Sequence, residues 1–340
     1  MTGKALHFIG VDISKLYVDA SLLSVVDHVK KEIVSDRFEN THAGMKTFSK
    51  WLKNNKVSFN GSTLLVIENT GIYHRLLWAF CCNNNIPIHI GNAAHIKWSF
   101  GIARGKNDKV DSVRLSLYAF KEADMLRAAP VLNPVLMQLK DLVTARTKLL
   151  SQINSIKVYI KELKNVSDPG IQKTLERAHR QAIAGMAASI KTLEAEIKLI
   201  LAKNIDLKKN YDLLISVPGI GHLTAIYLIC CTNNFINKIS GKQLASYAGV
   251  VPFEYSSGTS VRGRNKVHPM ANKDLKKALH LCALTAMKNY AEFKIYYQRK
   301  KAEGKHSMSI LNAIRNKIAL RAAAVINKQM PYMTFENKAA

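Results

Sequence analysis

Ile9-Gly10-Val11-Asp12-Ile13-Ser14-Lys15 is the stretch of this chain that decides its predicted fold. Its apolar residues predict a buried strand, and a second strand follows at once over residues 17–23. Asp12 is the one carboxylate in this run, where an unpaired charge among apolar neighbours is costly. It is interpreted either as a cap of the turn after the strand or as a metal ligand. The second interpretation requires partner acids elsewhere in the chain.

The charge of the chain predicts a polyanionic partner. Fifty Lys and Arg against twenty-four Asp and Glu give a formal net charge of +26 over 340 residues, and the usual cause of such an excess is binding to DNA or RNA. Binding to a membrane surface is the alternative. It is disfavoured because no single basic amphipathic helix carries the charge.

The composition predicts two or three globular domains in a reducing compartment. Hydrophobic residues make up 48% of the chain, but no run of eighteen apolar residues predicts a membrane span, and no signal peptide is evident at the start. We therefore expect a cytoplasmic protein. The cysteines form no CxxC pair and are predicted to be reduced core residues; they are Cys81, Cys82, Cys230, Cys231 and Cys282.

The first part of the chain, residues 1–125, is predicted to be an α/β domain. Residues 62–68 form a second apolar run, which predicts a buried strand ending in Glu68. Further predicted elements are a strand over residues 86–90 and helices over residues 41–54, 75–83 and 112–121, the last of them preceded by the polar segment 105–111.

The middle part, residues 126–205, is predicted to be a helical hairpin that is interrupted at residues 167–170. Steps of three and four residues separate the members of two apolar seams, as in a coiled coil. The first seam is Leu139, Leu142, Arg146, Leu149, Ile153, Ile156, Ile160 and Leu163, and the second is Ile183, Met186, Ile190, Leu193, Ile197 and Ile200. An arm for assembly and an ordinary pair of core helices are both compatible with this pattern.

The last part, residues 206–340, is predicted to be mostly helical around a glycine-rich, basic loop at residues 249–268, after which Asn272 is predicted to cap a helix over residues 273–287. Residues 217–221, Val-Pro-Gly-Ile-Gly, resemble a helix-hairpin-helix turn. Gly219 and Gly221 would let the backbone approach a phosphate next to a helix N-terminus. A tight turn between packed helices is the alternative.

The basic loop combines hydroxyl groups with cations. Residues 253–261 place serines and a threonine around glycine, and Arg262, Arg264 and Lys266 follow. A serine beside arginines can attack a phosphate, because guanidinium groups bind the anionic oxygens. His268 is a candidate general base by proximity alone. A phosphate-binding loop without covalent chemistry is the alternative.

Four acids are predicted to meet at one site. Asp12 and Glu68 lie on or at the end of predicted buried strands, and Asp108 and Asp111 are three residues apart at a predicted helix start. Carboxylates of this kind could hold one or two Mg²⁺ ions, which phosphoryl transfer uses to stabilise the attacking and leaving oxygens. The alternative for the last two acids is a favourable interaction with the helix N-terminus.

These motifs together resemble the IS-one-ten family of insertion-sequence transposases, the group that includes the pilin-gene invertases. The N-terminal match consists of residues 9–15, Glu68-Asn69-Thr70-Gly71 and Lys106-Asn107-Asp108-Lys109-Val110-Asp111. The C-terminal match consists of Val217-Pro218-Gly219-Ile220-Gly221, Tyr247-Ala248-Gly249-Val250-Val251-Pro252 and Ser257-Gly258-Thr259-Ser260-Val261-Arg262-Gly263.

The resemblance implies a RuvC-like (RNase H fold) α/β domain, a coiled-coil linker and a mostly α C-terminal transposase domain. It implies divalent metal, Mg²⁺ or Mn²⁺, on Asp12, Glu68, Asp108 and Asp111. It also implies a serine nucleophile, for which Ser257 is chosen because the family pattern has Ser-Gly here; Ser256 and Ser260 are competitors.

The resemblance also implies partners. They are donor and target DNA, a structured non-coding bridge RNA that guides the enzyme, and further copies of the chain in a tetramer (a dimer of dimers) with a composite active site. It implies a bacterial protein at the nucleoid, with no membrane partner. The alternative functions are a RuvC-like, Mg²⁺-dependent nuclease such as a junction resolvase, and a nucleic-acid-binding protein without catalysis.

Overall fold

The computed structural model describes residues 6–100, 108–163, 168–254, 256–257, 261–263, 266–267 and 270–333. Contacts within the chain divide it into two compact units, Met1–Leu132 and Asn133–Ala340. The three predicted domains, with boundaries near residues 125 and 205, stay a prediction, because compactness alone does not show which segments fold independently. None of the described helices is long and apolar enough to cross a membrane.

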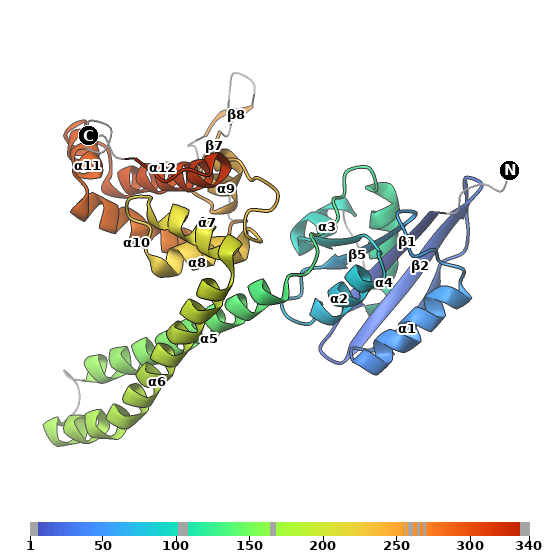
Figure 1. Cartoon of the computed structure of the whole chain (residues 1–340), viewed down its shortest axis with the longest axis horizontal. Coiled ribbons are helices and arrows are strands. Elements are labelled where there is room, and N and C mark those ends of the chain that lie inside the picture. Colours follow the sequence, from blue (N-terminus) through green and yellow to red (C-terminus); the bar gives the residue numbers. More distant parts are fainter. Residues whose placement is uncertain are drawn as a thin grey trace. The chain divides into compact units, whose positions relative to one another are not determined.

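The first unit is built on a mixed six-stranded sheet with the order β3-β2-β1-β5-β6, in which β4 also pairs with β2. β1, β2 and β4 are antiparallel neighbours, whereas β5 runs parallel to β1 and β6 parallel to β5 (Figure 1). The strands are β1 (Leu6–Ile13), β2 (Tyr17–Val26), β3 (Val29–Lys30), β4 (Val34–Glu39), β5 (Thr63–Glu68) and β6 (Ile88–Gly91), and the helices are α1 (His42–Asn54), α2 (Arg75–Asn83), α3 (Ala93–Ser99) and α4 (Asp108–Lys121).

Helices cover both faces of this sheet, which explains why β1 and β5 are continuous apolar runs. On one face, Phe8 of β1 and Val66 of β5 belong to the same buried cluster as Leu115 of α4. On the other face, the ring of Phe38 in β4 lies 5.2 Å from that of Phe48 in α1, centroid to centroid. The fold therefore buries a core on each side of the sheet.

Gly10 marks the point where α4 touches β1 backbone to backbone. A Cβ atom added to Gly10 would lie 2.0 Å from the amide nitrogen of Ser116 and 2.2 Å from the carbonyl oxygen of Ser112. Ser21, which pairs with Gly10 across the sheet, has its hydroxyl oxygen 2.8 Å from that of Ser112. Only glycine leaves room for the helix at this position.

These contacts also fix the direction of α4. Near the end of the helix, the ring of Phe120 packs edge-on against Phe8, with centroids 5.3 Å apart. Ser112, eight residues earlier, lies at Gly10. The helix thus runs antiparallel to β1, and its first turn points toward the end of the strand that carries Asp12.

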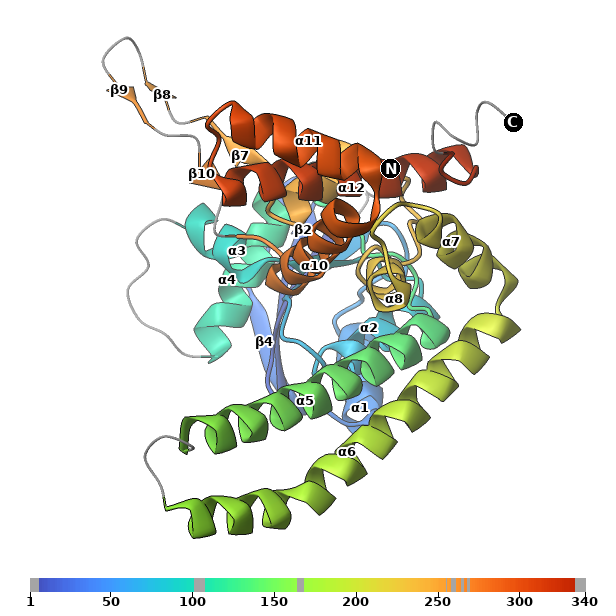
Figure 2. The ribbon, with the colours of Figure 1, turned by 90° about the vertical axis from the view of Figure 1, so that its left-hand side faces the viewer.

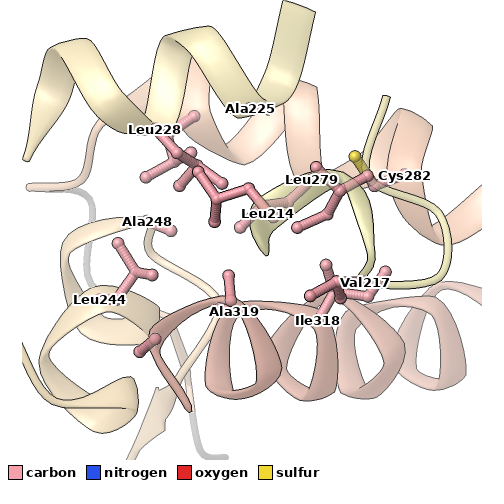
Figure 3. Packing of buried hydrophobic residues seen from close by; sticks show 14 of the residues in the cluster. Leu214, Val217, Ala225, Leu228, Leu244, Ala248, Leu279, Cys282, Ile318 and Ala319 are labelled. Carbon is pink, nitrogen blue, oxygen red and sulfur yellow. The ribbon is translucent and has the colours of Figure 1, made fainter. Parts of the chain in front are cut away.

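The second unit is mostly helical. Its helices are α5 (Pro134–Leu163), α6 (Pro169–Lys203), α7 (Ile205–Ile215), α8 (His222–Cys231), α9 (Gly241–Tyr247), α10 (Lys273–Asn289), α11 (Ala291–Ala302) and α12 (Ser307–Lys328), and its short strands are β7 (Pro252–Phe253), β8 (Ser256–Ser257), β9 (Val261–Arg262) and β10 (Lys266–Val267). One buried cluster joins the helices α5 to α12. Figure 3 shows part of it, with Leu214, Leu228, Leu279 and Ile318 meeting from four helices.

Helices α5 and α6 form the predicted hairpin. They lie side by side and extend beyond the body formed by α7 to α12 (Figures 1 and 2). Every residue of the two predicted seams is buried or half-buried. At the body, Leu139 and Ile197 join the common core, and Arg146 of α5 donates a hydrogen bond of 2.7 Å to Glu194 of α6. The two predicted helices and their apolar faces are therefore present, and a coiled coil stays a prediction.

Several other predictions are confirmed. The helix over residues 75–83 has the predicted bounds. The helix predicted over residues 41–54 is present from His42, because Thr41 caps it by accepting a hydrogen bond from the amide of Gly44. Asn272 caps α10 in the same way, accepting from Leu275. The five cysteines are free thiols.

The structure differs from the predicted elements in several places. The helix predicted from residue 112 begins at Asp108 in the described chain. Helix α3 was not expected, because its seven residues are too short for a clear helical period; Asn92 caps it. Residues 249–268, expected to be a loop, contain four two-residue strands, whose pairing depends on backbone hydrogen bonds that no side-chain pattern reports.

Candidate active site

Two of the predicted acids stand at the ends of neighbouring strands. Val11 of β1 pairs with Ile67 of β5 in the parallel ladder, and Asp12 and Glu68 each follow that pair by one residue. Alternate residues of a strand face the same side, so both acids lie on the face of Gly10, which α4 covers. Both are half-buried.

The other two predicted acids lie in the first turn of α4. Asp108 is the first described residue of the helix and Asp111 follows three residues later, which places both acids at the described start of α4. One carboxylate oxygen of Asp111 accepts a hydrogen bond of 2.9 Å from Nη1 of Arg114. The side chain of Asp108 lies outside the described part of the chain.

The sheet also places at this end a further acid, which no sequence motif marks. Asp19 of β2 pairs directly with Asp12 of β1, and only 7% of its surface is exposed. Arg37 of β4 holds the carboxylate with two hydrogen bonds, of 2.9 Å from Nε and 3.1 Å from Nη2. In the sequence Asp19 is only a polar residue of a predicted strand. Its neighbours Asp12 and Arg37 follow from the strand register, which the sequence pattern does not show.

The donor groups at this end of the sheet are carboxylates, the chemical type that a hard divalent cation binds. Carboxylate oxygens are the ligands that Mg²⁺ prefers, and Asp12 and Glu68 offer them from two rigid strands below the start of α4. Among the side chains that the structure describes, no three His, Cys, Asp or Glu residues are close enough together to hold a metal ion. The side chain of Asp108 is not among them, so the four-acid site stays a prediction.

The predicted serine nucleophile lies in the second unit, on a short hairpin. In the β8–β9 ladder, Ser256 pairs with Arg262 and Ser257 pairs with Val261. The hairpin projects from the helical body (Figures 1 and 2). Gly258, Ser260, Arg264 and His268 lie outside the described residues. Ser256 and Ser257 of β8 are therefore directly opposite the two residues of β9, one of which is Arg262.

A second short ladder forms the stem of this hairpin. Phe253 pairs with Lys266 and Pro252 with Val267, which places the predicted nucleic-acid contact Lys266 on β10. Below the stem, Gly249 has a φ of +63°, and an added Cβ atom would lie 2.3 Å from the Cβ of Ala271. The chain segments before β7 and after β10 are therefore in close contact at Gly249 and Ala271.

Asn272 ties the base of the stem to the helices. Its side-chain oxygen accepts hydrogen bonds from the hydroxyl of Tyr227, at 3.0 Å, and from the amide of Leu275, and its side-chain nitrogen donates to the hydroxyl of Tyr247, at 2.9 Å. Burial raises the pKa of Tyr227 to about 12, so its hydroxyl stays protonated and donates. The sequence showed Asn272 only as a helix cap.

The turn between α7 and α8 gives its two glycines different surroundings. Gly219 is buried with a φ of +89°, and an added Cβ atom would lie 2.5 Å from the carbonyl oxygen of Cys282 in α10. Gly221 is exposed, with no atom within 4 Å of an added Cβ. Gly219 thus has a packing role of its own, and the predicted approach to a phosphate is sterically open at Gly221.

His222 begins α8 immediately after these glycines. Its Nδ1 atom lies 2.6 Å from the hydroxyl oxygen of Tyr211. Burial lowers the pKa of His222, and the charges of Lys198 and Arg146 lower it further, whereas Glu194 raises it. The imidazole is therefore neutral near pH 7, and the α8 N-terminus would attract a phosphate through its backbone amides alone.

Replacing Gly219 by alanine is expected to lower the free energy of unfolding by about 2 kcal/mol, because the new Cβ atom meets backbone and the positive φ is strained. Gly221→Ala is the matched control and should change it by less than about 0.5 kcal/mol. Urea denaturation followed by circular dichroism measures both. Equal midpoints for the two variants would contradict the packing role of Gly219.

Two family models match the chain in succession. The DEDD transposase model of IS110, described as a transposase, matches residues 9–164. The model described as the transposase IS116/IS110/IS902 family matches residues 211–298. The first match contains Asp12, Glu68, Asp108 and Asp111, and the second contains Ser257.

Known proteins are similar over the whole chain or part of it. The pilin gene-inverting protein of Moraxella bovis is 29% identical over 332 residues, which are 96% of this chain and 97% of that protein. The insertion element IS110 uncharacterized 43.6 kDa protein of Streptomyces coelicolor is 31% identical over 48% of this chain and 38% of its own length. The transposase for insertion sequence element IS1328 of Yersinia enterocolitica is 28% identical over 47% of each chain.

Proposed function

Because this chain belongs to the IS110 (IS-one-ten) family of transposases, which are DNA-recombining enzymes, we propose that it cuts and rejoins DNA strands at specific sites with two sets of residues. One set is the four acids of the first unit, Asp12, Glu68, Asp108 and Asp111. The other is Ser257 with the basic residues around it. The observation that carries the proposal is the placement of Asp12 and Glu68 at adjacent strand ends under the start of α4.

The first unit is proposed to be an RNase H fold of the RuvC type. Three antiparallel strands followed by two parallel ones, with a helix across β1, support this proposal. Asp12 and Glu68 would hold Mg²⁺ or Mn²⁺ from the strands, and Asp108 and Asp111 from the helix. When bound, the ion stabilises the negative charge that develops on the phosphate and on the leaving oxygen.

Ser257 is proposed to be the nucleophile. Its hydroxyl oxygen would form a bond to the phosphorus of the DNA backbone as the hydroxyl loses its proton. The bond from phosphorus to the leaving sugar oxygen breaks, and that oxygen takes up a proton. Arg262 and Arg264 would bind the phosphate oxygens, because guanidinium groups match their geometry. Lys266, on the stem, and Gly221, at the exposed turn, would add contacts to the backbone of the nucleic acid.

The proposed partners are donor DNA, target DNA, a structured guide RNA and further copies of the chain in a tetramer. The net charge of +26 supports a large polyanionic partner. The exposed apolar residues on the outer part of the α5–α6 hairpin, among them Val158, Tyr159 and Ile171, support contacts between copies.

The proposal is tested by trapping the covalent intermediate. Purified protein is incubated with labelled donor and target DNA, Mg²⁺ and guide RNA, and protein–DNA adducts are separated in denaturing gels. We expect adducts with the wild-type chain and with Ser256→Ala and Ser260→Ala, and none with Ser257→Ala, because only Ser257 supplies the attacking oxygen.

The same gels separate the alternatives. Cleaved DNA without an adduct in any variant would favour a metal-dependent nuclease. Bound DNA without cleavage would favour a nucleic-acid-binding protein. Loss of the adduct in Ser256→Ala instead of Ser257→Ala would move the nucleophile to the residue that pairs with Arg262.

A further inference from the structure

Helices α11 and α12 lie side by side and together line a pocket of about 210 Å³ (Figure 2). The lining residues are Glu292, Phe293, Ile295, Tyr296, Arg299 and Lys317. Phe293 is buried in the common core, whereas 63% of the surface of Ile295 is exposed. The pocket therefore combines apolar side chains with charged ones at the surface of the helical body.

Two cations share the ring of Tyr296 in this pocket. The Nζ atom of Lys317 lies 4.8 Å from the ring centroid, and the guanidinium carbon of Arg299 lies 5.8 Å from it. Both cations are attracted by the ring, but they repel each other. A negative charge held between them would relieve this repulsion, so the geometry favours an anionic ligand.

The acids around the pocket leave much of this positive charge in place. Glu292 forms an ion pair with Arg321, and Glu303 is 3.9 Å from Nε of Arg299, which is too far for a hydrogen bond. Within the described part of the chain, no Asp or Glu lies within ion-pair distance of Lys317. The surrounding segment is also basic, because residues 291–328 contain nine Lys and Arg but only two Glu and no Asp.

We propose that this pocket binds an unpaired nucleotide of a nucleic-acid strand, with the phosphate between Lys317 and Arg299 and the base against Ile295 and Tyr296. The inference rests on the proposed function only in assuming a nucleic-acid partner. An unpaired nucleotide matches the lining because it offers an apolar base face next to a phosphate. Bases inside a duplex are stacked on one another and do not offer that face.

The experiment measures binding of a labelled single-stranded oligonucleotide to the full chain by fluorescence anisotropy, at increasing salt and with RNA and DNA of the same sequence. Tyr296→Leu removes the ring and should weaken binding about tenfold, whereas Tyr296→Phe keeps the ring and should bind like the wild type. Lys317→Gln should weaken binding about threefold and lower the salt dependence by about one phosphate contact.

Lys328→Gln is the matched control for the loss of charge. Lys328 is an exposed lysine of the same helix, about 16 Å from Lys317 along the helix axis. Its charge is screened from the pocket at that distance, so the affinity should stay within about twofold of the wild type. Losses in the pocket variants for RNA, for DNA or for both support the site and identify its strand.

A photo-crosslink locates the bound strand on the chain. Oligonucleotides that contain 4-thiouridine or 4-thiothymidine are irradiated with the wild-type chain, and we expect crosslinked peptides from α11 that include Tyr296. Wild-type affinity of both Tyr296→Leu and Lys317→Gln, or equal losses with a duplex of the same sequence, would overturn the proposal.

Two further results separate the possible failures. If the wild-type chain binds no single strand, the nucleic-acid partner of the proposed function fails and not only this pocket. If circular dichroism shows that Tyr296→Leu does not fold, Lys317→Glu replaces it, because this side chain is exposed. The proposal then requires about tenfold weaker binding in Lys317→Glu, and wild-type binding in that variant overturns it.

Discussion

Replacing Gly10 by alanine is expected to destabilise the first unit by about 3 kcal/mol or more. The new Cβ atom would lie 2.0 Å from the amide nitrogen of Ser116 and 2.2 Å from the carbonyl oxygen of Ser112. Both atoms are backbone, so no side-chain rotation relieves the contact. Helix α4 would have to move away from β1, which opens the buried cluster around Phe8 and Leu115.

Tryptophan fluorescence measures this effect selectively, because all three tryptophans, Trp51, Trp78 and Trp98, belong to the first unit. Urea unfolding of Gly10→Ala should show a much lower midpoint than that of the wild type. Gly61→Ala is the matched control, since no atom lies within 4 Å of its added Cβ, and should stay within about 0.5 kcal/mol. A wild-type midpoint in Gly10→Ala would contradict the close contact of α4.

Replacing Asp12 by asparagine is expected to reduce strand exchange by about 10³-fold or more, because a metal ligand contributes several kcal/mol of transition-state stabilisation. The change keeps the shape of the side chain and removes its charge. Tryptophan fluorescence should therefore report a folded first unit. Binding of the proposed guide RNA should persist, because the substitution leaves every Lys and Arg of the chain in place.

Strand exchange is measured with donor DNA, target DNA, guide RNA and Mg²⁺. Asp27→Asn is the control: Asp27 is an exposed acid in the turn after β2, with a φ of +52° that asparagine tolerates. It should exchange strands at the wild-type rate. Intact activity in Asp12→Asn would refute the metal-site proposal, whereas equal losses in both variants would point to a general effect of charge.

The sequence predicts those parts of the fold that depend on local patterns. The apolar runs that end at Asp12 and Glu68 are strands β1 and β5, and the two seams predict α5 and α6. These predictions succeed because hydrophobic period and run length are properties of contiguous residues. The mixed α/β first unit and the helical second unit follow from them.

The parts that were missed depend on contacts between distant residues. Asp19 is an unremarkable strand residue until the register places it opposite Asp12 and beside Arg37. Gly219 carried a phosphate-binding signature in the sequence, yet its buried position against Cys282 follows from the packing of α10 on the turn. Register and helix packing are fixed by the whole core, so no local motif contains them.

One buried core of the second unit connects the base of the α5–α6 hairpin with the segment that leads to Ser257. Leu139 and Ile197 at the base of α5 and α6 belong to the same buried cluster as Val250. Val250 lies shortly before β7, which pairs with β10 below the β8–β9 hairpin. A close-packed core transmits displacement because it deforms little. A displacement of the outer ends of α5 and α6 would thus be transmitted through this core to the strands β7 and β10.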